Sequence, residues 1–316
     1  GVLMIKLKGV TKQFGTTRAL DNFSLEVKEG LVYGLIGPNG AGKTTAMSIL
    51  ATLLLPDAGT ALVNGRDVVQ DPQEVRGLIG YMPDFFGVYD GLRSAEYLEF
   101  FAAAYGVPAA KRPQLIKSLL ELVNLPDKGE VYVDTLSRGM KQRLALARCL
   151  VHDPRVLILD EPASGLDPRA RAELKEIIRQ LKHLDKTVLI SSHILPELAE
   201  MCDEVAIIEH GRLVTCGPVD QITRSAKGAR QLRVGVAEPV PDLAGFLNQQ
   251  PGVSSPWVEG LTAQFFYQGD QSQQAQLLQT LVASGWPVIE FGEVRRNLEE
   301  VFMAITGEEG LPNGGN

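Results

Sequence analysis

The chain has 316 residues, a mass of 34.3 kDa and a formal net charge of −7, with 45% hydrophobic and 22% charged residues. This length suffices for one large domain or two domains, and the acidic balance disfavours a nucleic-acid-binding surface. The three cysteines form no CxxC pair, which predicts a reducing compartment rather than a disulfide scaffold or a zinc site. No apolar run reaches the roughly 18 residues of a membrane-spanning helix, and no signal peptide is recognisable, so we expect a soluble chain.

Short β-branched runs alternate with helical patterns over the first two thirds of the chain. The predicted strands are 4–10, 19–27, 31–37, 60–65, 78–82, 156–160, 187–192, 204–209 and 211–217. Several of these runs are continuously apolar, as in strands of a parallel sheet that is covered on both faces. Residues 93–150 instead repeat apolar residues every three to four positions and predict a mostly helical subdomain. We therefore expect an α/β domain over residues 1–222.

Beyond Ile222 the pattern changes to that of a smaller domain. A linker at 223–230 precedes strands and helices in the order β-α-β-β-α-β, which suggests a ferredoxin-like α+β sandwich. A further helix is expected at 297–307. Residues 223–307 are thus predicted to form a C-terminal α+β domain, and residues 308–316 a disordered tail.

A phosphate-binding loop is the first functional motif. The segment Gly37-Pro-Asn-Gly-Ala-Gly-Lys-Thr-Thr45 matches GxxxxGK[ST] between an apolar strand and a helical pattern. Glycines let the backbone wrap round an anion, and the helix adds the positive end of its dipole. Lys43 is predicted to reach the β- and γ-phosphates, and the Thr44 hydroxyl to bind Mg²⁺. The residues expected to bind the nucleotide are Gly37, Pro38, Asn39, Gly40, Ala41, Gly42, Lys43, Thr44 and Thr45.

Two adjacent carboxylates, Asp160 and Glu161, follow the apolar run at 156–159. In open α/β sheets, ligands bind at the carboxyl ends of the strands. Asp160 is expected to hold Mg²⁺ through water, and Glu161 to polarise the attacking water. The alternative is a solvated pair that caps a helix before Pro162.

The segment Leu136-Ser-Arg-Gly-Met-Lys-Gln-Arg143 resembles the signature of the ABC-transporter ATPases, which is usually LSGGQ. Ser137 is a good N-cap for the helix that follows. In that family, Ser137 and the backbone of Gly139 would bind the γ-phosphate of an ATP held by the opposite subunit. The sequence departs from the family pattern at Arg138, where the family has glycine, and at Met140. A capped surface helix is the alternative.

Further motifs of this family occur in the chain, in the same order as in the family. Residues 164–167, which end in Asp167, resemble the D-loop that acts across the dimer. His193 resembles the switch histidine that contacts the γ-phosphate, and Phe14 resembles the aromatic residue that stacks on adenine. The alternatives are an ordinary strand-end histidine for His193 and a core aromatic for Phe14. Asp84 occupies the position of a glutamine that contacts Mg²⁺ and the attacking water; its alternative role is to initiate a turn.

Four exposed apolar residues after Asp84 suit the groove that receives the coupling helix of a permease in this family. They are Phe85, Phe86, Val88 and Tyr89. The remaining histidines match no motif and are expected at the surface: His152, His183 and His210.

The resemblance covers residues 4 to about 220. It implies a P-loop ABC ATPase domain with a mixed sheet core, an antiparallel β-subdomain and a helical subdomain. It further implies a chain that binds ATP and Mg²⁺, hydrolyses ATP as a head-to-tail homodimer around two ATP molecules, and drives a separate transmembrane permease. Such a subunit is cytoplasmic and lies peripherally on the inner face of the plasma membrane.

The C-terminal segment 297–307 resembles that of drug-resistance, ABC-2 type exporters. Three alternatives remain open at this stage. In the first, the α+β appendage only stabilises the homodimer. In the second, the chain is a non-transport regulatory or clamp ABC ATPase. In the third, the chain serves an importer.

Overall fold

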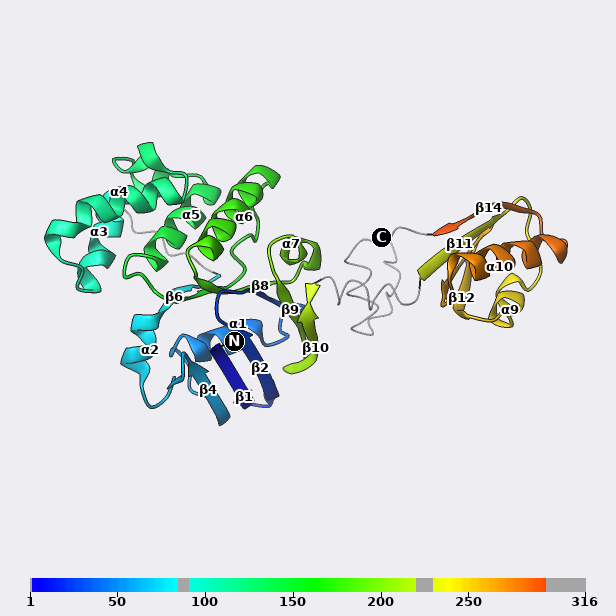
Figure 1. The fold of residues 1–316 in the computed structure, drawn as a ribbon, viewed down its shortest axis with the longest axis horizontal. Helices are drawn as coiled ribbons and strands as arrows, with labels where there is room; N and C mark the ends of the chain where they lie inside the picture. The colour runs from blue at the N-terminus through cyan, green and yellow to red at the C-terminus, as the bar shows by residue number, and fades with distance from the viewer. Residues whose placement is uncertain (1, 85–90, 220–229, 294–316) are drawn as a thin grey trace. The chain divides into compact units, whose positions relative to one another are not determined.

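The computed structural model describes residues 2–84, 91–219 and 230–293 (Figure 1). The chain forms two compact units, Gly1–Val219 and Asp220–Asn316. Within the described residues, no helix combines the length and the apolar character needed to cross a bilayer.

A six-stranded sheet forms the centre of the first unit, with the strand order β10-β9-β3-β8-β7-β6. The strands are β3 (Val32–Ile36), β6 (Ile79–Met82), β7 (Val156–Leu159), β8 (Thr187–Ser192), β9 (Glu204–Glu209) and β10 (Arg212–Pro218). All neighbours are parallel except β10, which is antiparallel to β9. Strands β3, β7 and β8 are buried along their whole length, which explains their uninterrupted apolar or small-residue sequences. Because these strands are parallel, the segments that follow them meet at one edge of the sheet.

A second, antiparallel sheet of four strands has the order β2-β1-β4-β5. Its strands are β1 (Leu3–Phe14), β2 (Thr17–Lys28), β4 (Ala58–Val63) and β5 (Arg66–Asp67). Helix α1 (Lys43–Leu50) contributes Met47 and Ile49 to a core that also contains side chains from both sheets, such as Phe23 and Ile208. The two sheets and α1 therefore share one hydrophobic core, and that core anchors the loop that precedes α1.

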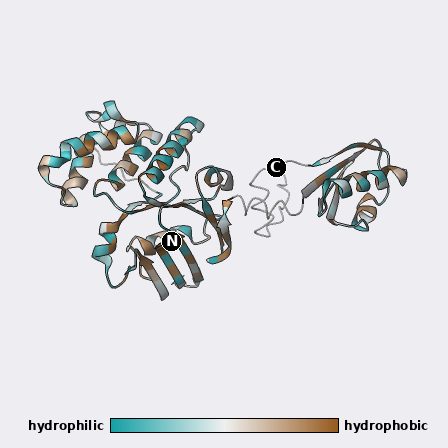
Figure 2. Cartoon of the chain, viewed as in Figure 1, coloured by the Kyte–Doolittle hydropathy of each residue, from teal (hydrophilic) through white to brown (hydrophobic). Residues whose placement is uncertain are grey.

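The helices include three that confirm the expected helical subdomain: α3 (Ser94–Ala104), α4 (Arg112–Leu122) and α5 (Arg138–Cys149). The sequence analysis did not predict α2 (Pro72–Leu78), α6 (Pro168–His183) or α7 (Leu195–Ala199). Helix α6 buries a narrow stripe that includes Leu174, Ile178 and Leu181, while most of its other residues are hydrophilic (Figure 2). This stripe follows the helical period, but charged residues interrupt it in the linear sequence.

Helix α5 packs very closely on β6. A Cβ atom at Gly80 would lie 2.4 Å from the backbone oxygen of Cys149, so only glycine fits between strand and helix. The guanidinium of Arg148 donates to the backbone oxygen of Tyr81 at 2.9 Å, and Nε2 of His152 lies 2.8 Å from the backbone oxygen of Ile79. The helix that carries the signature-like segment is thereby fixed to the edge of the central sheet.

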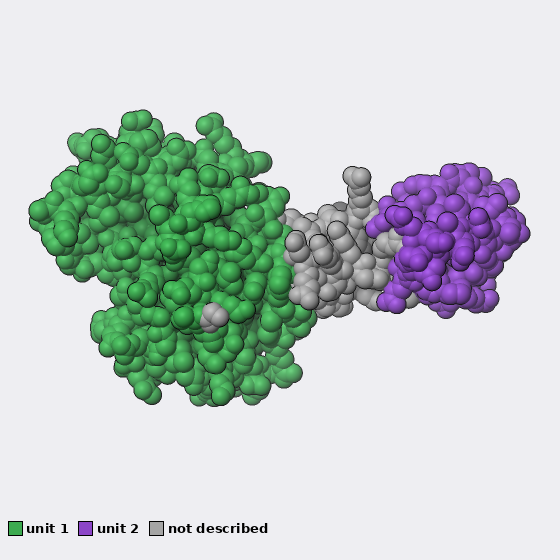
Figure 3. All heavy atoms as spheres, viewed as in Figure 1, with its two compact units in different colours: residues 1–219 green, residues 220–316 purple. Residues whose placement is uncertain are grey.

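The second unit, whose described residues are purple in Figure 3, has the predicted element order β-α-β-β-α-β. Its elements are β11 (Arg230–Val236), α9 (Leu243–Asn248), β12 (Val253–Glu259), β13 (Thr262–Tyr267), α10 (Gln271–Ala283) and β14 (Val288–Glu293). The antiparallel sheet has the order β12-β13-β11-β14, and its core joins Val234 and Phe265 to Leu247 and Leu281 of the helices. The observed architecture agrees with the expected one, a mixed central sheet with an antiparallel β-subdomain and a helical subdomain, followed by a small α+β domain. The helix predicted at 297–307, the tail and most of the linker lie outside the described residues.

Candidate active site

The glycine-rich loop joins β3 to α1 and leaves no room for a side chain at Gly37 or at Gly42. A Cβ atom at Gly37 would lie 2.4 Å from the backbone oxygen of Ile208, and one at Gly42 would lie 2.5 Å from that of Ala19. Gly42 also has a φ of +108° and Gly40 one of +83°, which disfavour any residue with a side chain. The loop is therefore a bare backbone cradle at the start of α1, which suits an anion such as phosphate.

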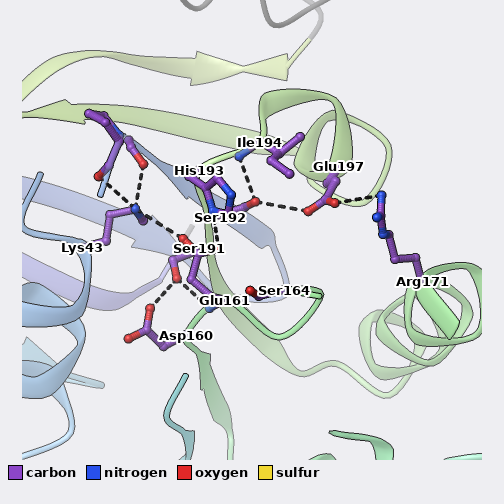
Figure 4. A network of polar contacts seen from close by, with 12 residues as sticks. Lys43, Asp160, Glu161, Ser164, Arg171, Ser191, Ser192, His193, Ile194 and Glu197 are labelled. Carbon is purple, nitrogen blue, oxygen red and sulfur yellow. Dashed lines mark hydrogen bonds and ion pairs between the residues drawn. The ribbon is translucent and has the colours of Figure 1, made fainter. Parts of the chain in front are cut away.

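Lys43, the first residue of α1, points its ammonium group back into this loop. Its Nζ donates to the backbone oxygens of Gly37 at 2.6 Å and of Pro38 at 3.1 Å, and it lies 3.3 Å from Oε1 of Glu161 (Figure 4). The side chain is only 6% exposed. Thr44 is exposed and Thr45 is half-buried in the same helical turn. The cation of the loop is thus in contact with the carboxylate that was predicted to be catalytic.

Asp160 and Glu161 follow β7 and are buried, with exposed fractions of 1% and 9%. The alternative of a solvated capping pair is therefore wrong, and the next helix, α6, begins only at Pro168. Oδ2 of Asp160 is buried without a hydrogen-bond partner, so this oxygen is available to coordinate a metal ion. Glu161 has a φ of +48°, an uncommon conformation for a non-glycine residue and one often found at functional sites.

Ser191, at the end of β8, holds both acidic residues and was missed by the sequence analysis. Its hydroxyl donates to Oδ1 of Asp160 at 2.6 Å and accepts from the backbone N–H of Glu161 at 2.9 Å (Figure 4). The available signal was the pair Ser191–Ser192, two polar residues at the end of an otherwise apolar strand. The sequence could not show that this strand lies beside the one that ends in Asp160.

His193 follows β8 directly, and its Nδ1 lies 2.9 Å from Oε2 of Glu161. A chain of polar contacts supports the loop that contains this histidine. Ser192 Oγ accepts from the backbone N–H of Ile194 at 3.0 Å and donates to Oε2 of Glu197 at 3.3 Å (Figure 4). Lys43 and His193 thus contact opposite oxygens of one carboxylate, since Lys43 lies near Oε1.

Asp84 is exposed and lies two residues beyond the end of β6. Burial raises the pKa of this carboxyl, and the negative charges of Asp160 and Glu161 raise it further, whereas Arg138 and His193 partly lower it. The negative charges that act on Asp84 therefore belong to the acidic residues of the site. Phe85, Phe86, Val88 and Tyr89, which follow it, lie outside the described residues.

Phe14, the last residue of β1, is 48% exposed. The alternative of a core aromatic is therefore wrong, and an exposed ring is free to stack on a planar ligand. Its neighbour Lys12 places Nζ 5.6 Å from the ring centroid.

The signature-like segment lies at the start of α5, as expected. Ser137 caps the helix by accepting from the backbone N–H of Met140 at 3.3 Å, and Asp167 caps α6 by accepting from that of Ala170 at 2.9 Å. Ser137, Gly139 and Asp167 line one cavity of about 390 Å³. Among the described residues, the lining of this cavity includes none from the phosphate loop.

His152 is not the surface residue that the sequence analysis expected. Its ring stacks on that of Tyr105 at a centroid distance of 3.8 Å, and burial lowers its pKa. The contact of its ring with the backbone of β6 explains the position of His152, and no local sequence pattern predicts this contact. The other two, His183 and His210, are exposed as predicted.

A bare backbone loop closed by Lys43, beside Asp160 and Glu161 at a neighbouring strand end, defines a P-loop nucleotide-binding protein. The family described as ABC transporter matches residues 20–164. The chain is 35% identical to the daunorubicin/doxorubicin resistance ATP-binding protein DrrA of Streptomyces peucetius, over 96% of this chain and 92% of that protein. It is 32% identical to the Nod factor export ATP-binding protein I of Ralstonia nicotianae, over 97% and 94%. The chain belongs to the ABC transporter family, in which it is an ATP-binding subunit.

A solved structure described as the ATP binding subunit of an ABC transporter has the same fold. The two share 30% sequence identity with a TM-score of 0.64, over 70% of this chain and 92% of that one. The fold class and the family predicted from the sequence are thereby confirmed.

Proposed function

We propose that this subunit hydrolyses ATP and uses the reaction to drive export through a separate transmembrane permease. The observation that carries the proposal is the meeting of Lys43, Asp160, Glu161 and His193 at the carboxyl ends of β3, β7 and β8. This arrangement supplies a phosphate cradle, a ligand for a metal ion, a general base and a group that orients the base.

In this proposal, the loop from Gly37 to Gly42 and the ammonium group of Lys43 bind the β- and γ-phosphates. Thr44 and Asp160 would hold Mg²⁺, with Asp84 as a further oxygen donor; the free Oδ2 of Asp160 fits this role. When bound, Mg²⁺ would supply positive charge that offsets the negative charge developing on the phosphates during transfer.

Glu161 would accept a proton from the attacking water. Its carboxylate lies between Lys43, 3.3 Å from Oε1, and His193, 2.9 Å from Oε2. A γ-phosphate would attract Lys43, so Oε1 of Glu161 would become available to orient the water, while His193 would hold the other oxygen. His193 would also be close enough to the phosphate to sense its loss.

The second half of the nucleotide site would come from another copy of the chain. Ser137, Gly139 and Asp167 line a separate cavity, at the positive end of the α5 dipole. In a head-to-tail homodimer, this surface would cover the phosphates bound by the partner, and each chain would complete one of two ATP sites. Phe14 would stack on adenine, which requires only the face of its ring.

A groove beside β6 suits the permease. It has a volume of about 440 Å³ and is lined by Leu53, Tyr105, Arg76 and Arg148, among others. Leu53 and Tyr105 are 65% and 47% exposed, so an apolar helix with acidic residues would fit both the side chains and the charge. Two relatives are named for drug resistance and for Nod factor export, which supports export as the direction. The subunit would then lie on the cytoplasmic face of the plasma membrane.

We propose domain limits of 1–222 for the ATPase domain and 223–307 for the α+β domain, with 308–316 as a tail. Among the described residues, the hydrophobic core of the second unit, which contains Val234 and Phe265, includes no residue of the nucleotide site. A role in stabilising the homodimer fits this unit as well as a role specific to exporters.

The variant Glu161→Gln tests the proposed function. It keeps the size and most contacts of the side chain but cannot accept the proton, so hydrolysis should stop while ATP still drives dimer formation. Phosphate release and sedimentation with and without ATP measure the two effects, and Glu200→Gln on the exposed end of α7 serves as the control. Hydrolysis near the wild-type rate, or a monomer at saturating ATP, would contradict the proposal.

A further inference from the structure

Arg138 makes a contact that the glycine of the usual signature could not make. Its guanidinium lies against the backbone of Gly165: a Cβ atom built there would be 2.7 Å from Cζ and 2.8 Å from both terminal nitrogens. One of these nitrogens also donates to the backbone oxygen of Ser164 at 3.0 Å. Gly165 has a φ of +66°, a conformation that favours glycine, and any side chain at this position would displace the guanidinium of Arg138.

The residues beside Gly165 connect this contact to the catalytic carboxylate. The backbone N–H of Ser164 donates to the backbone oxygen of Glu161 at 3.0 Å, which closes a tight turn directly after β7. On the other side, Nε of Arg171 donates to the backbone oxygen of Leu166 at 2.9 Å. The segment 164–166 is therefore held between two arginines, one from the start of α5 and one from α6.

Arg171 extends the connection to the histidine loop. Its guanidinium lies 3.1 Å from Oε1 of Glu197, and Oε2 of Glu197 accepts from Ser192, the residue before His193. The contacts of Arg171 thus link the segment 164–166 to the loop that contains His193.

We infer that Arg138 is a positioning residue that locks the segment 164–166 to the start of α5, so that α5 and Glu161 of one chain move together. The consequence rests on the proposed head-to-tail dimer. There, the start of α5 serves the ATP of the partner, whereas Glu161 serves the ATP of its own chain. Arg138 therefore couples the two ATP sites.

The chemistry of the contact needs arginine rather than any cation. A planar guanidinium lies flat on a peptide backbone while one of its N–H groups donates to a carbonyl, whereas lysine has a compact charge and no flat face. This difference separates a positioning role from a simple electrostatic contact with phosphate, for which lysine would also serve.

Three variants of the full-length chain test the inference. Arg138→Gln removes the charge and the flat face, Arg138→Lys keeps only the charge, and Gly165→Ala displaces the guanidinium from the other side. Gln and Lys are both good helix formers, so α5 should persist. Arg179→Gln, which removes an exposed arginine from the middle of α6, is the matched control.

The first measurement is hydrogen exchange of the segment 161–168 without nucleotide. The amides of Ser164 and Leu166 are hydrogen-bonded, so we expect their exchange to accelerate by about fivefold or more in all three variants but not in the control. The second measurement is the ATP dependence of hydrolysis. We expect a Hill coefficient between about 1 and 2 for the wild type and a value near 1 for the variants, because two coupled sites set the upper limit.

Wild-type exchange and a wild-type Hill coefficient in Arg138→Lys would overturn the inference, since charge alone would then suffice. A Hill coefficient of 1 in the wild type would overturn the coupling as well. Failure of the proposed function would be seen separately. In that case the Glu161→Gln variant would hydrolyse ATP, or it would stay monomeric in the presence of ATP. The exchange measurement requires neither hydrolysis nor a dimer, so the two failures can be distinguished.

Discussion

Ser191 donates a hydrogen bond of 2.6 Å to Oδ1 of Asp160, and both side chains are buried. The two residues are 31 positions apart in the sequence, but they end neighbouring parallel strands. Because the same hydroxyl accepts from the backbone N–H of Glu161, one small side chain fixes the proposed metal ligand and the proposed base at once.

Ser191→Ala should therefore impair both stability and turnover. It leaves the N–H of Glu161 and Oδ1 of Asp160 without this partner, which should lower the free energy of unfolding by about 1–3 kcal/mol. We expect kcat to fall by about tenfold or more with a smaller change in ATP affinity, because the cradle of backbone N–H groups is untouched. Urea unfolding and steady-state kinetics measure the two effects, with the exposed Ser118→Ala in α4 as the control. An unchanged kcat would show that Ser191 has no role in positioning the acids.

Asp84→Asn should change the Mg²⁺ dependence of hydrolysis. If Asp84 supplies an oxygen to the metal, the neutral amide will raise the Mg²⁺ concentration needed for half-maximal hydrolysis. An unchanged Mg²⁺ requirement would leave Asp84 as a turn residue.

The same substitution has a pH-dependent effect on stability. The pKa of Asp84 is raised in the folded state by burial and by Asp160 and Glu161, so its ionised form is disfavoured there. The destabilisation by this charge is present at high pH and disappears as the pH falls through the raised pKa. We therefore expect Asp84→Asn to increase the melting temperature at pH 8 and to have no such effect at pH 3.

Asp57→Asn is the matched control with the opposite sign. The backbone N–H of Gln13 and the ammonium of Lys12 lower the pKa of Asp57. Its ionised form is therefore favoured in the folded state, and that stability is lost as the pH falls through the lowered pKa. Asp57→Asn should lower the melting temperature at neutral pH, so the same sign for both variants would contradict this account.

Phe14→Ala should weaken nucleotide binding without unfolding the protein. Stacking of a base on an aromatic ring is worth about 1–3 kcal/mol, so the KM for ATP should rise by about tenfold or more. Since stacking needs only a planar ring, GTP should be affected equally and Phe14→Tyr should be close to wild type. Tyr132→Ala, at another exposed aromatic residue, is the control. A KM unchanged by Phe14→Ala would remove this residue from the nucleotide site.

Changes in the groove beside β6 should separate permease binding from ATP binding. Leu53→Glu puts a negative charge on the apolar wall, and Tyr105→Ala removes the ring that stacks on His152. Both should reduce co-purification with the permease and its stimulation of hydrolysis, while ATP-driven dimer formation in the Glu161→Gln background persists. Leu184→Glu, which is 55% exposed outside the groove, is the control. Normal co-purification of both groove variants would place the permease elsewhere.

The sequence predicted well those features that depend on neighbouring residues. The phosphate loop is one continuous segment, and Ser137 caps the helix that it precedes, so both could be recognised locally. Asp160 and Glu161 could be recognised because the buried strand before them is itself an uninterrupted apolar run.

Features that depend on which strands are adjacent could not be predicted. Ser191 acts on residues of another strand, His152 is half-buried because it packs beside β6, and Arg138 contacts Gly165 only in the folded chain. Helix α6 is a different case: its apolar residues follow the helical period with charged residues between them, so it could have been predicted from the sequence.

The close packing of α5 on β6 also affects the tendency of the chain to aggregate. Strand β6 is the last strand of the central sheet, and its outward carbonyls, on Ile79 and Tyr81, are bound by His152 and Arg148. An edge strand with free backbone groups is a template for aggregation through intermolecular strand pairing. The subdomain that carries the signature therefore also covers this edge of the sheet. A chain without this subdomain would expose β6 as an edge strand that is prone to intermolecular strand pairing.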